Sequence, residues 1–315
     1  MNILGFDIGG TKSIVGVADE SGRVLAMRRL ETRGALGPAQ ALDRMKAAAH
    51  DVIEEAGVRV DVIGIGCGGP LDRRSGTLYT VPNLPGWEGI CLTDEFGGEF
   101  GVPAYLENDA NAAAMGEHLF GAGKGVDDFV FLIVGTGIGG GIIANGRIYR
   151  GYGENAGEIG HHKIAPDGPR CPCGDRGCLE SLASGTSIAR IAREGLADHP
   201  DTILRQWTSS PEEVTAEMVA RAAAGGDEFA SGVWSQCMRN LGIGVANVVN
   251  ILNPKLVILG GGVTKAGEML FEPVRTVVKE RAMPALAADV EIVPAANGDL
   301  MGLMGAFAVA VEAQL

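Results

Sequence analysis

The stretch around which the fold is organised is Gly157–Glu180, with the sequence GEIGHHKIAPDGPRCPCGDRGCLE. It holds Cys171, Cys173 and Cys178 within eight residues, and His161 lies ten residues before the first of them. Three thiols and an imidazole in a loop rich in Gly and Pro are typical of a tetrahedral, four-ligand and therefore structural Zn²⁺ site. The alternative is three unrelated thiols in a surface loop, which fits less well because cysteine prefers burial.

This stretch resembles the zinc signature of the ROK family, which contains bacterial sugar kinases and sugar-responsive repressors. The resemblance is carried by Gly-Glu-x-Gly-His at 157–161 and Cys-x-Cys-Gly-x-x-Gly-Cys-x-Glu at 171–180. Other family motifs follow in the expected order along nearly all 315 residues. The resemblance implies an α/β chain with the two-domain actin-like ATPase (ribonuclease H-like) fold and a cleft between the domains. We expect a small N-terminal domain at 1–107 with 301–315, and a large domain with the zinc loop at 108–300.

The composition excludes several classes of protein. A chain of 315 residues with 46% hydrophobic and 21% charged residues is an ordinary globular protein of about two domains. The formal net charge of −13 argues against a nucleic-acid partner, which would need a basic face. The sequence shows no signal segment and no long apolar run, so we expect a cytoplasmic protein with reduced cysteines and no membrane partner.

One arrangement of strands and turns occurs twice. Alternating apolar residues at 2–8 lead into a Gly-rich turn at 9–12, and two further strands follow. The segment 129–148 repeats this plan around a second Gly-rich turn at 135–141. We infer an internal duplication that produces two similar halves facing one cleft. Such turns expose backbone N–H groups to anionic phosphate, although either turn alone could be a plain hairpin.

Two other nucleotide motifs do not fit. The pattern Gly-x-Gly-x-x-Gly at 135–140 has the letters of a dinucleotide fingerprint, but a strand and a turn follow instead of the required helix. Gly-Lys at 123–124 is followed by Gly125, where a P-loop needs Ser or Thr.

Apolar periodicity predicts the remaining elements. The expected helices are 38–56, 110–120, 184–197, 215–224, 228–252, 266–281 and 301–313, and the expected further strands are 60–66, 103–107, 256–259 and 290–294. The loop at 81–87 carries one amide, Asn83, and one aromatic ring, Trp87. Amides and aromatic faces suit a sugar pocket, but for Trp87 we favour a plain anchor of the loop on the core.

A carboxylate opens the helix expected at 110–120. By itself, Asp109 is more simply a helix cap, because exposed N–H groups and the helix dipole stabilise a negative charge there. The run Glu107-Asn108-Asp109-x-Asn111, however, resembles the catalytic motif of the ROK family. The resemblance implies that Asp109, as an ordinary ionised carboxylate, accepts the proton of a sugar hydroxyl that attacks the γ-phosphorus.

The resemblance also implies the binding residues. The expected sugar ligands are Asn83, Asn108, Asp109, Glu158, His161 and Glu180. The expected contacts to ATP and its phosphates are Asp7, Gly9, Gly10, Thr11, Lys12, Gly135, Thr136, Gly137, Gly261 and Gly262. Asp7 is also the expected Mg²⁺ ligand, directly or through water. His161 is expected to bind Zn²⁺ through one ring nitrogen and to donate to the sugar from the other.

The implied function is ATP-dependent hexose phosphorylation, with glucose as the leading substrate and glucose 6-phosphate and ADP as products. The alternative is an N-acetylhexosamine kinase acting on N-acetylmannosamine or N-acetylglucosamine, or another sugar kinase of the ROK family. Gly68 and Gly69 favour it, because many ROK glucokinases carry Pro-Gly here and a wall without side chains could admit a 2-substituent.

Two further classes are disfavoured. A sugar-responsive regulator would carry a DNA-binding segment, but Asp7 leaves only six residues before it. An inactive sugar-binding protein would not be expected to retain Asp109 and Lys12. The sequence leaves open whether the donor is ATP or polyphosphate, and whether the chain forms a homodimer or a homotetramer.

Overall fold

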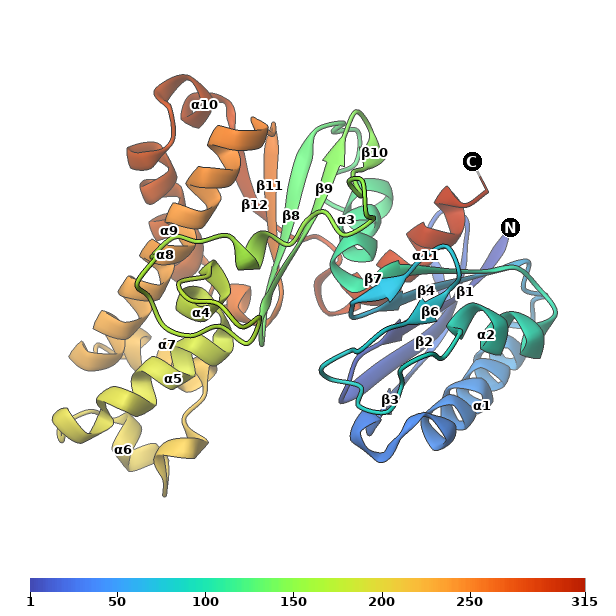
Figure 1. Ribbon diagram of the computed structural model, residues 1–315, viewed down its shortest axis with the longest axis horizontal. Coiled ribbons are helices and arrows are strands. Elements are labelled where there is room, and N and C mark those ends of the chain that lie inside the picture. Colours follow the sequence, from blue (N-terminus) through green and yellow to red (C-terminus); the bar gives the residue numbers. More distant parts are fainter. Residues whose placement is uncertain (315) are drawn as a thin grey trace. The chain divides into compact units, whose positions relative to one another are not determined.

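The computed structural model describes residues 1–314, apart from the side chain of Ala35 (Figure 1). The chain forms two compact units. Unit 1 contains Met1–Asp127, Gly141–Gly157 and Ala295–Leu315, and unit 2 contains Asp128–Gly140 and Glu158–Pro294. No described helix is long and apolar enough to cross a membrane.

Unit 1 is built on a five-stranded sheet with the order β3-β2-β1-β4-β7. Its strands are β1 (Asn2–Ile8), β2 (Lys12–Asp19), β3 (Val24–Glu31), β4 (Val62–Cys67) and β7 (Ala104–Asn108). The first three strands are antiparallel, whereas β4 and β7 run parallel to β1. The unit also contains α1 (Pro38–Ala56), α2 (Leu92–Phe100), α3 (Asp109–Phe120), α11 (Met301–Glu312) and the small hairpin β5 (Leu71–Asp72) and β6 (Thr77–Leu78).

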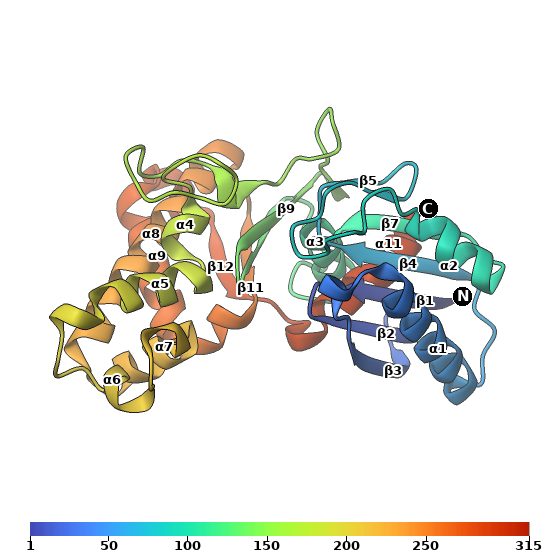
Figure 2. The ribbon, with the colours of Figure 1, turned by 60° about the horizontal axis from the view of Figure 1, so that its bottom comes forward.

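Apolar side chains cover both faces of this sheet. Leu4 and Phe6 of β1 pack in the core that includes α1 and α2, whereas Ile3 packs against Leu303 and Phe307 of α11. Successive side chains of a strand point to opposite faces, so one strand supplies both cores. Figure 1 and Figure 2 show α1 and α2 on one face and α11 on the other.

The second sheet has the order β10-β9-β8-β11-β12. Its strands are β8 (Phe129–Val134), β9 (Ile138–Ala144), β10 (Arg147–Ile148), β11 (Leu256–Gly260) and β12 (Glu291–Pro294). The chain passes from unit 2 into unit 1 within β9. The helices of unit 2 are α4 (Leu179–Ala183), α5 (Gly185–Gly195), α6 (Leu204–Trp207), α7 (Ala216–Ala224), α8 (Glu228–Leu252), α9 (Glu268–Arg281) and α10 (Pro284–Asp289).

The two sheets follow one plan. In each, the first three strands form an antiparallel meander, and two parallel strands extend the sheet beyond the first of them. The repeated arrangement that the sequence predicts around 2–30 and 129–148 is therefore confirmed.

Most expected elements are present, and the differences have physical reasons. Helices α1 and α8 begin and end where predicted. Helix α2 was not expected, because Gly97 and Gly98 weaken helical propensity. It forms because Leu92 and Phe96 are fully buried, with the ring of Phe96 stacked 4.0 Å from that of Phe6. Tertiary packing thus outweighs local propensity.

Trp87 holds the loop at 81–87 in place, as the sequence analysis predicts. Trp87 is completely buried, and its Nε1 donates to the carbonyl oxygen of Gly34 at 3.3 Å. The ring therefore anchors the loop on the core of unit 1, which fixes the position of Asn83 four residues earlier.

Candidate active site and metal centre

The predicted catalytic residues of unit 1 lie at one edge of its sheet. Strands β1, β4 and β7 are parallel, and their register pairs Asp7 with Gly66 and Cys67 with Asn108. The carboxyl ends of these strands therefore meet at the same edge, which is where α/β proteins commonly bind ligands. Asp7 and Asp109, distant in sequence, are brought together there.

The predicted phosphate turn, 9–12, joins β1 to β2 at this edge. The backbone N–H of Gly9 donates to the carbonyl oxygen of Lys12 at 3.1 Å, which closes the turn. A Cβ on Gly10 would lie 2.3 Å from the carbonyl oxygen of Asn83. Only glycine therefore allows the two segments to approach so closely, and the structure brings Asn83 against the turn. Thr11 and Lys12 are exposed beside it.

The turn from β7 into α3 gives Asn108 and Asp109 different positions at the start of the helix. The side-chain oxygen of Asn108 accepts the N–H groups of Ala110 at 3.0 Å and of Asn111 at 3.3 Å, so Asn108 caps the helix. Asp109 is already the first helical residue, and its side chain is exposed to solvent. The interpretation of Asp109 as the helix cap is therefore wrong, because the residue before it holds that position.

The carboxyl groups of Asp7 and Asp109 both have raised pKa values. The pKa of Asp7 rises from 3.8 to about 7, chiefly because burial removes hydration and secondly because of the Asp109 charge, while Arg29 opposes the shift. Loss of hydration also raises the pKa of Asp109, against hydrogen bonds that include the N–H of Ala110. The pKa of Asp109 is thus higher than the ordinary value expected from the sequence, although the residue is exposed.

The raised pKa of Asp7 predicts a pH-dependent loss of stability. Between about pH 4 and pH 7, folded Asp7 keeps a proton that the unfolded chain releases, so raising the pH favours unfolding. Asp7→Asn removes this linkage. Its free energy of unfolding, relative to that of the unchanged protein, should therefore rise by about 2–4 kcal/mol as the pH increases across that window. Urea unfolding without divalent ions, at pH 4.5 and pH 8, measures the difference. An equal pH dependence in both proteins would show that Asp7 is not the cause.

Two Gly-rich turns meet at an edge of the second sheet. The turn at 135–137 follows β8, the turn at 261–262 follows β11, and these neighbouring strands are parallel. Gly261 has a φ of 95°, and a Cβ there would lie 2.4 Å from the carbonyl oxygen of Val134. The structure thus brings together the two turns that the sequence assigns to the nucleotide. In the first of them, Gly135 N–H donates to the carbonyl oxygen of Gly137 at 2.9 Å.

Glu180 connects the first of these turns to helix α4. Its Oε2 accepts the N–H of Ile138 at 2.9 Å, and a Cβ on Gly137 would lie 2.4 Å from the same oxygen. Glu158 is more loosely held, since its side chain is 66% exposed and its Oε2 lies 3.8 Å from His161 Nε2. Unit 2 therefore places Glu158, His161 and Glu180 around the loop that carries the cysteines.

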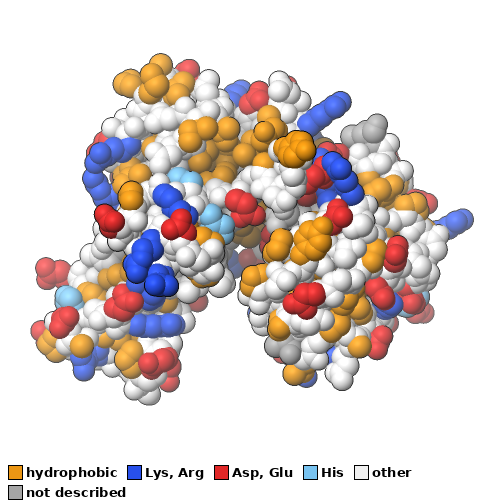
Figure 3. All heavy atoms as spheres, in the orientation of Figure 1, with side chains coloured by type: hydrophobic (Ala, Val, Ile, Leu, Met, Phe, Trp, Pro, Cys, Tyr) orange, Lys and Arg blue, Asp and Glu red, His pale blue; other side chains and the backbone are white. Residues whose placement is uncertain are grey.

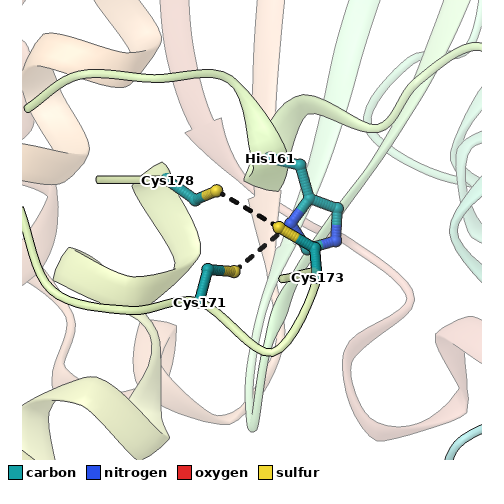
Figure 4. A group of neighbouring side chains, drawn as sticks. All are labelled: His161, Cys171, Cys173 and Cys178. Carbon is teal, nitrogen blue, oxygen red and sulfur yellow. Dashed lines mark hydrogen bonds between the residues drawn. The ribbon is translucent and has the colours of Figure 1, made fainter. Parts of the chain in front are cut away.

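The predicted metal ligands form one cluster in unit 2. The ligand atoms of His161, Cys171, Cys173 and Cys178 all lie within 4.8 Å of one another. His161 ends a short 3₁₀ helix (Ile159–His161), and Cys178 directly precedes α4. Figure 4 shows the four side chains converging, with the imidazole turned toward the thiols.

The distances within this cluster fit a tetrahedral metal site. Cys173 Sγ lies 3.6 Å from Cys178 Sγ, and His161 Nδ1 lies 3.6 Å from Cys171 Sγ. Tetrahedral zinc with metal–sulfur bonds of about 2.3 Å and metal–nitrogen bonds of about 2.0 Å requires edges of roughly 3.6–3.8 Å. Since Nδ1 faces the thiols, Nε2 remains available for another partner. The His161 side chain is 33% exposed, and histidines reach the surface of unit 2 in Figure 3.

Two neighbours of the cluster have different roles. His162 points elsewhere, because its Nδ1 donates to the carbonyl oxygen of Ile159 at 2.5 Å. Lys163 Nζ donates to Cys178 Sγ at 2.9 Å and lies 3.2 Å from the Asp175 carboxylate. The positive charge of Lys163 partly neutralises the negative charge that several cysteine thiolates would bring to the cluster. Sequence reasoning missed this contact, because a lysine in a polar loop carries no signal of its partner.

The chain resembles proteins of one family along nearly its whole length. The profile described as "ROK family" matches residues 3–313. The glucokinase of Thermotoga maritima is 38% identical over 313 residues, which cover 99% of this chain and 98% of that protein.

Solved structures agree with this relationship. A ROK family glucokinase from Streptomyces griseus, in complex with glucose and AMPPNP, has a TM-score of 0.86 and 34% identity, covering 99% of this chain and 100% of that one. The ROK hexokinase from Thermus thermophilus has a TM-score of 0.83 and 35% identity, covering 100% of this chain and 99% of that one. The expected α/β fold of the actin-like ATPase class is therefore confirmed.

Proposed function

The chain belongs to the ROK family, and we propose that it is an ATP-dependent kinase that phosphorylates glucose to glucose 6-phosphate. The observation that carries this proposal is the likeness, over nearly the full length, to glucokinases, one of which was solved with glucose and AMPPNP. Asp109 supports it independently, because an exposed carboxylate at the carboxyl edge of a sheet can accept a proton from a bound hydroxyl.

The residues of unit 1 perform the proton transfer and part of the phosphate binding. Asp109 takes the hydroxyl proton as the sugar oxygen attacks the γ-phosphorus, and the bond from that phosphorus to the β–γ bridging oxygen breaks, which releases ADP. Asn83 and Asn108 hold sugar hydroxyls. The N–H groups at 9–11 and the charge of Lys12 bind phosphate. Asp7 fits a Mg²⁺ ligand, because its raised pKa marks a carboxylate whose lost hydration a cation would compensate. Bound Mg²⁺ neutralises the charge of the phosphates.

Unit 2 supplies the remaining ligands. The backbone of the 135–137 and 261–262 turns binds the nucleotide, and Glu158, His161 and Glu180 bind sugar hydroxyls. The cluster of His161 with three cysteines holds a structural Zn²⁺, which keeps the imidazole in one orientation. With Nδ1 turned to the thiols, Nε2 of His161 donates to the sugar. The metal shapes this part of the site and takes no part in the reaction.

A sugar screen tests the proposal. The purified protein is assayed for ADP release with ATP, Mg²⁺ and a dozen sugars, and the phosphorylated products are identified by mass spectrometry. We expect the highest kcat/KM with glucose and transfer to its 6-hydroxyl. Phosphorylation of no sugar would overturn the proposal, and replacing ATP by polyphosphate in the same assay identifies the donor.

One observation keeps an N-acetylhexosamine kinase as the second candidate. A Cβ on Gly68 would lie 3.8 Å from Asp109 Oδ2, and one on Gly69 would lie 3.3 Å from Asn108 Nδ2. Positions 68 and 69, beside the proposed base, thus carry no side chain, as a larger sugar substituent at this place would require. A higher kcat/KM with N-acetylmannosamine or N-acetylglucosamine than with glucose would establish this candidate.

A further inference from the structure

A buried carboxylate lies two residues before the proposed base. Glu107, on β7, has a side chain that is only 2% exposed. Its Oε1 accepts the backbone N–H of Asn108 at 3.0 Å and the side-chain amide of Asn111 at 3.2 Å. Asn108 caps α3, and Asn111 belongs to the first turn of that helix. Glu107 therefore holds both sides of the turn that carries Asp109.

The other oxygen of Glu107 is paired with Arg150. Arg150 Nε donates to Glu107 Oε2 at 2.7 Å, and its terminal nitrogens donate to the Glu312 carboxylate at 2.6 and 3.5 Å. The Arg150 side chain is only 17% exposed. A second guanidinium, that of Arg73, lies 3.9 Å from the same oxygen. A buried carboxylate is costly unless it is paired and hydrogen-bonded, so the burial of Glu107 depends chiefly on Arg150, the nearer partner. Arg150 in turn connects the turn to Glu312, the last residue of α11.

We propose that Glu107, paired with Arg150, is a positioning residue for phosphoryl transfer. By accepting hydrogen bonds on both sides of Asp109, it holds that carboxylate in the orientation in which it accepts the sugar proton. This inference rests on the proposed function of the chain. Displacement of a catalytic group by about 1 Å can cost about 10²-fold in rate, so the contribution of Glu107 belongs in kcat rather than in sugar affinity.

Glu107→Gln tests the proposal with little change in shape. A carboxylate accepts hydrogen bonds from both sides, whereas an amide has one accepting oxygen and one donating nitrogen. The amide must therefore present its NH₂ group either to Arg150 or to the donors of Asn108 and Asn111. We expect kcat to fall roughly 10- to 100-fold, while the Kd for glucose, measured by calorimetry, changes less than about threefold.

A second replacement should restore part of the rate. In Glu107→Gln with Arg150→Met, the NH₂ group no longer meets the Arg150 guanidinium, which is the nearer of the two, so the carbonyl can turn to Asn108 and Asn111. We expect this double variant to have at least about threefold higher kcat than Glu107→Gln alone. A purely structural salt bridge predicts the opposite, because removing both partners would destabilise the unit without restoring turnover.

Glu95→Gln is the matched control. Glu95, on α2 of the same unit, pairs with Lys46 Nζ at 2.8 Å, and this bond does not involve Glu107 or the turn at Asp109. Its kcat should stay within about threefold of the unchanged protein. If Glu107→Gln does not fold, Arg150→Lys carries the test, because an ammonium cannot reproduce the fork to Glu107 and Glu312, and kcat should fall about tenfold.

Two results would overturn the inference while the proposed function stands. One is a kcat for Glu107→Gln, or for Arg150→Lys in its place, within about threefold of the unchanged kinase. The other is an equal loss of kcat in Glu95→Gln. If the unchanged protein phosphorylates no sugar, the proposed function fails, and this inference fails with it.

Discussion

Asp109→Asn is expected to lower kcat by about 10²–10⁴, the usual cost of removing a general base. The fold should be retained, because Asn108 and not Asp109 caps α3. The affinity for glucose should change little, since an amide fills the same space and still offers an oxygen to the N–H of Ala110 that Asp109 now bonds at 2.8 Å. Steady-state rates, calorimetry with glucose and thermal unfolding measure the three properties.

Asp94→Asn provides the control for this replacement. Asp94 also lies in the first turn of a helix of unit 1, and it is exposed. It has no proposed part in the reaction, so its kcat should match that of the unchanged protein. Residual activity of Asp109→Asn within about tenfold of the unchanged enzyme would show that another group accepts the proton.

The cluster of His161 with the three cysteines could be predicted residue by residue because its signal is local. His161 and the three cysteines lie in one short loop, and each of these residue types has a strong preference for zinc. The Gly-rich turns were also predictable, because each follows an apolar strand. Once the strands are parallel, their carboxyl ends must meet, so the sheet order brings the turns at 135–137 and 261–262 together.

Other features depend on contacts between distant segments and leave little trace in the sequence. Glu107 and Arg150 are 43 residues apart, and nothing near either residue indicates that they pair. The choice between Asn108 and Asp109 as the helix cap also could not be made from residue types, since both cap helices well. The backbone of the turn places Asn108 at the cap position and Asp109 at the first helical position, where Asp109 is exposed to solvent.

His161→Ala is expected to lose the metal, whereas His162→Ala is expected to retain it. Both imidazoles lie in the same loop, but only His161 Nδ1 faces the thiols, at 3.6 Å from Cys171 Sγ. His162 Nδ1 instead donates to a backbone carbonyl of its own segment. The sequence alone cannot distinguish the two histidines as metal ligands. The structure distinguishes them by the direction in which Nδ1 of each ring points.

The size of the loss follows from the number of ligands. Structural zinc sites contribute about 10–16 kcal/mol through four ligands, so one ligand represents roughly 3–4 kcal/mol, or a 10²- to 10³-fold loss in zinc affinity. A hydrogen bond from Nε2 to a sugar hydroxyl is worth about 0.5–1.5 kcal/mol by itself. His161→Ala should weaken glucose binding by more than this, because the loop that leads to Glu180 loses its metal as well.

Zinc content by elemental analysis and glucose affinity by calorimetry, on both variants, test this assignment. His162→Ala should leave both properties close to those of the unchanged protein. If His162→Ala loses zinc and His161→Ala keeps it, the ligand assignment is wrong. If His161→Ala loses zinc but binds glucose normally, the metal is purely structural and Nε2 does not contact the sugar. Joint loss of zinc and glucose affinity in His161→Ala alone is the result that the orientation of its ring predicts.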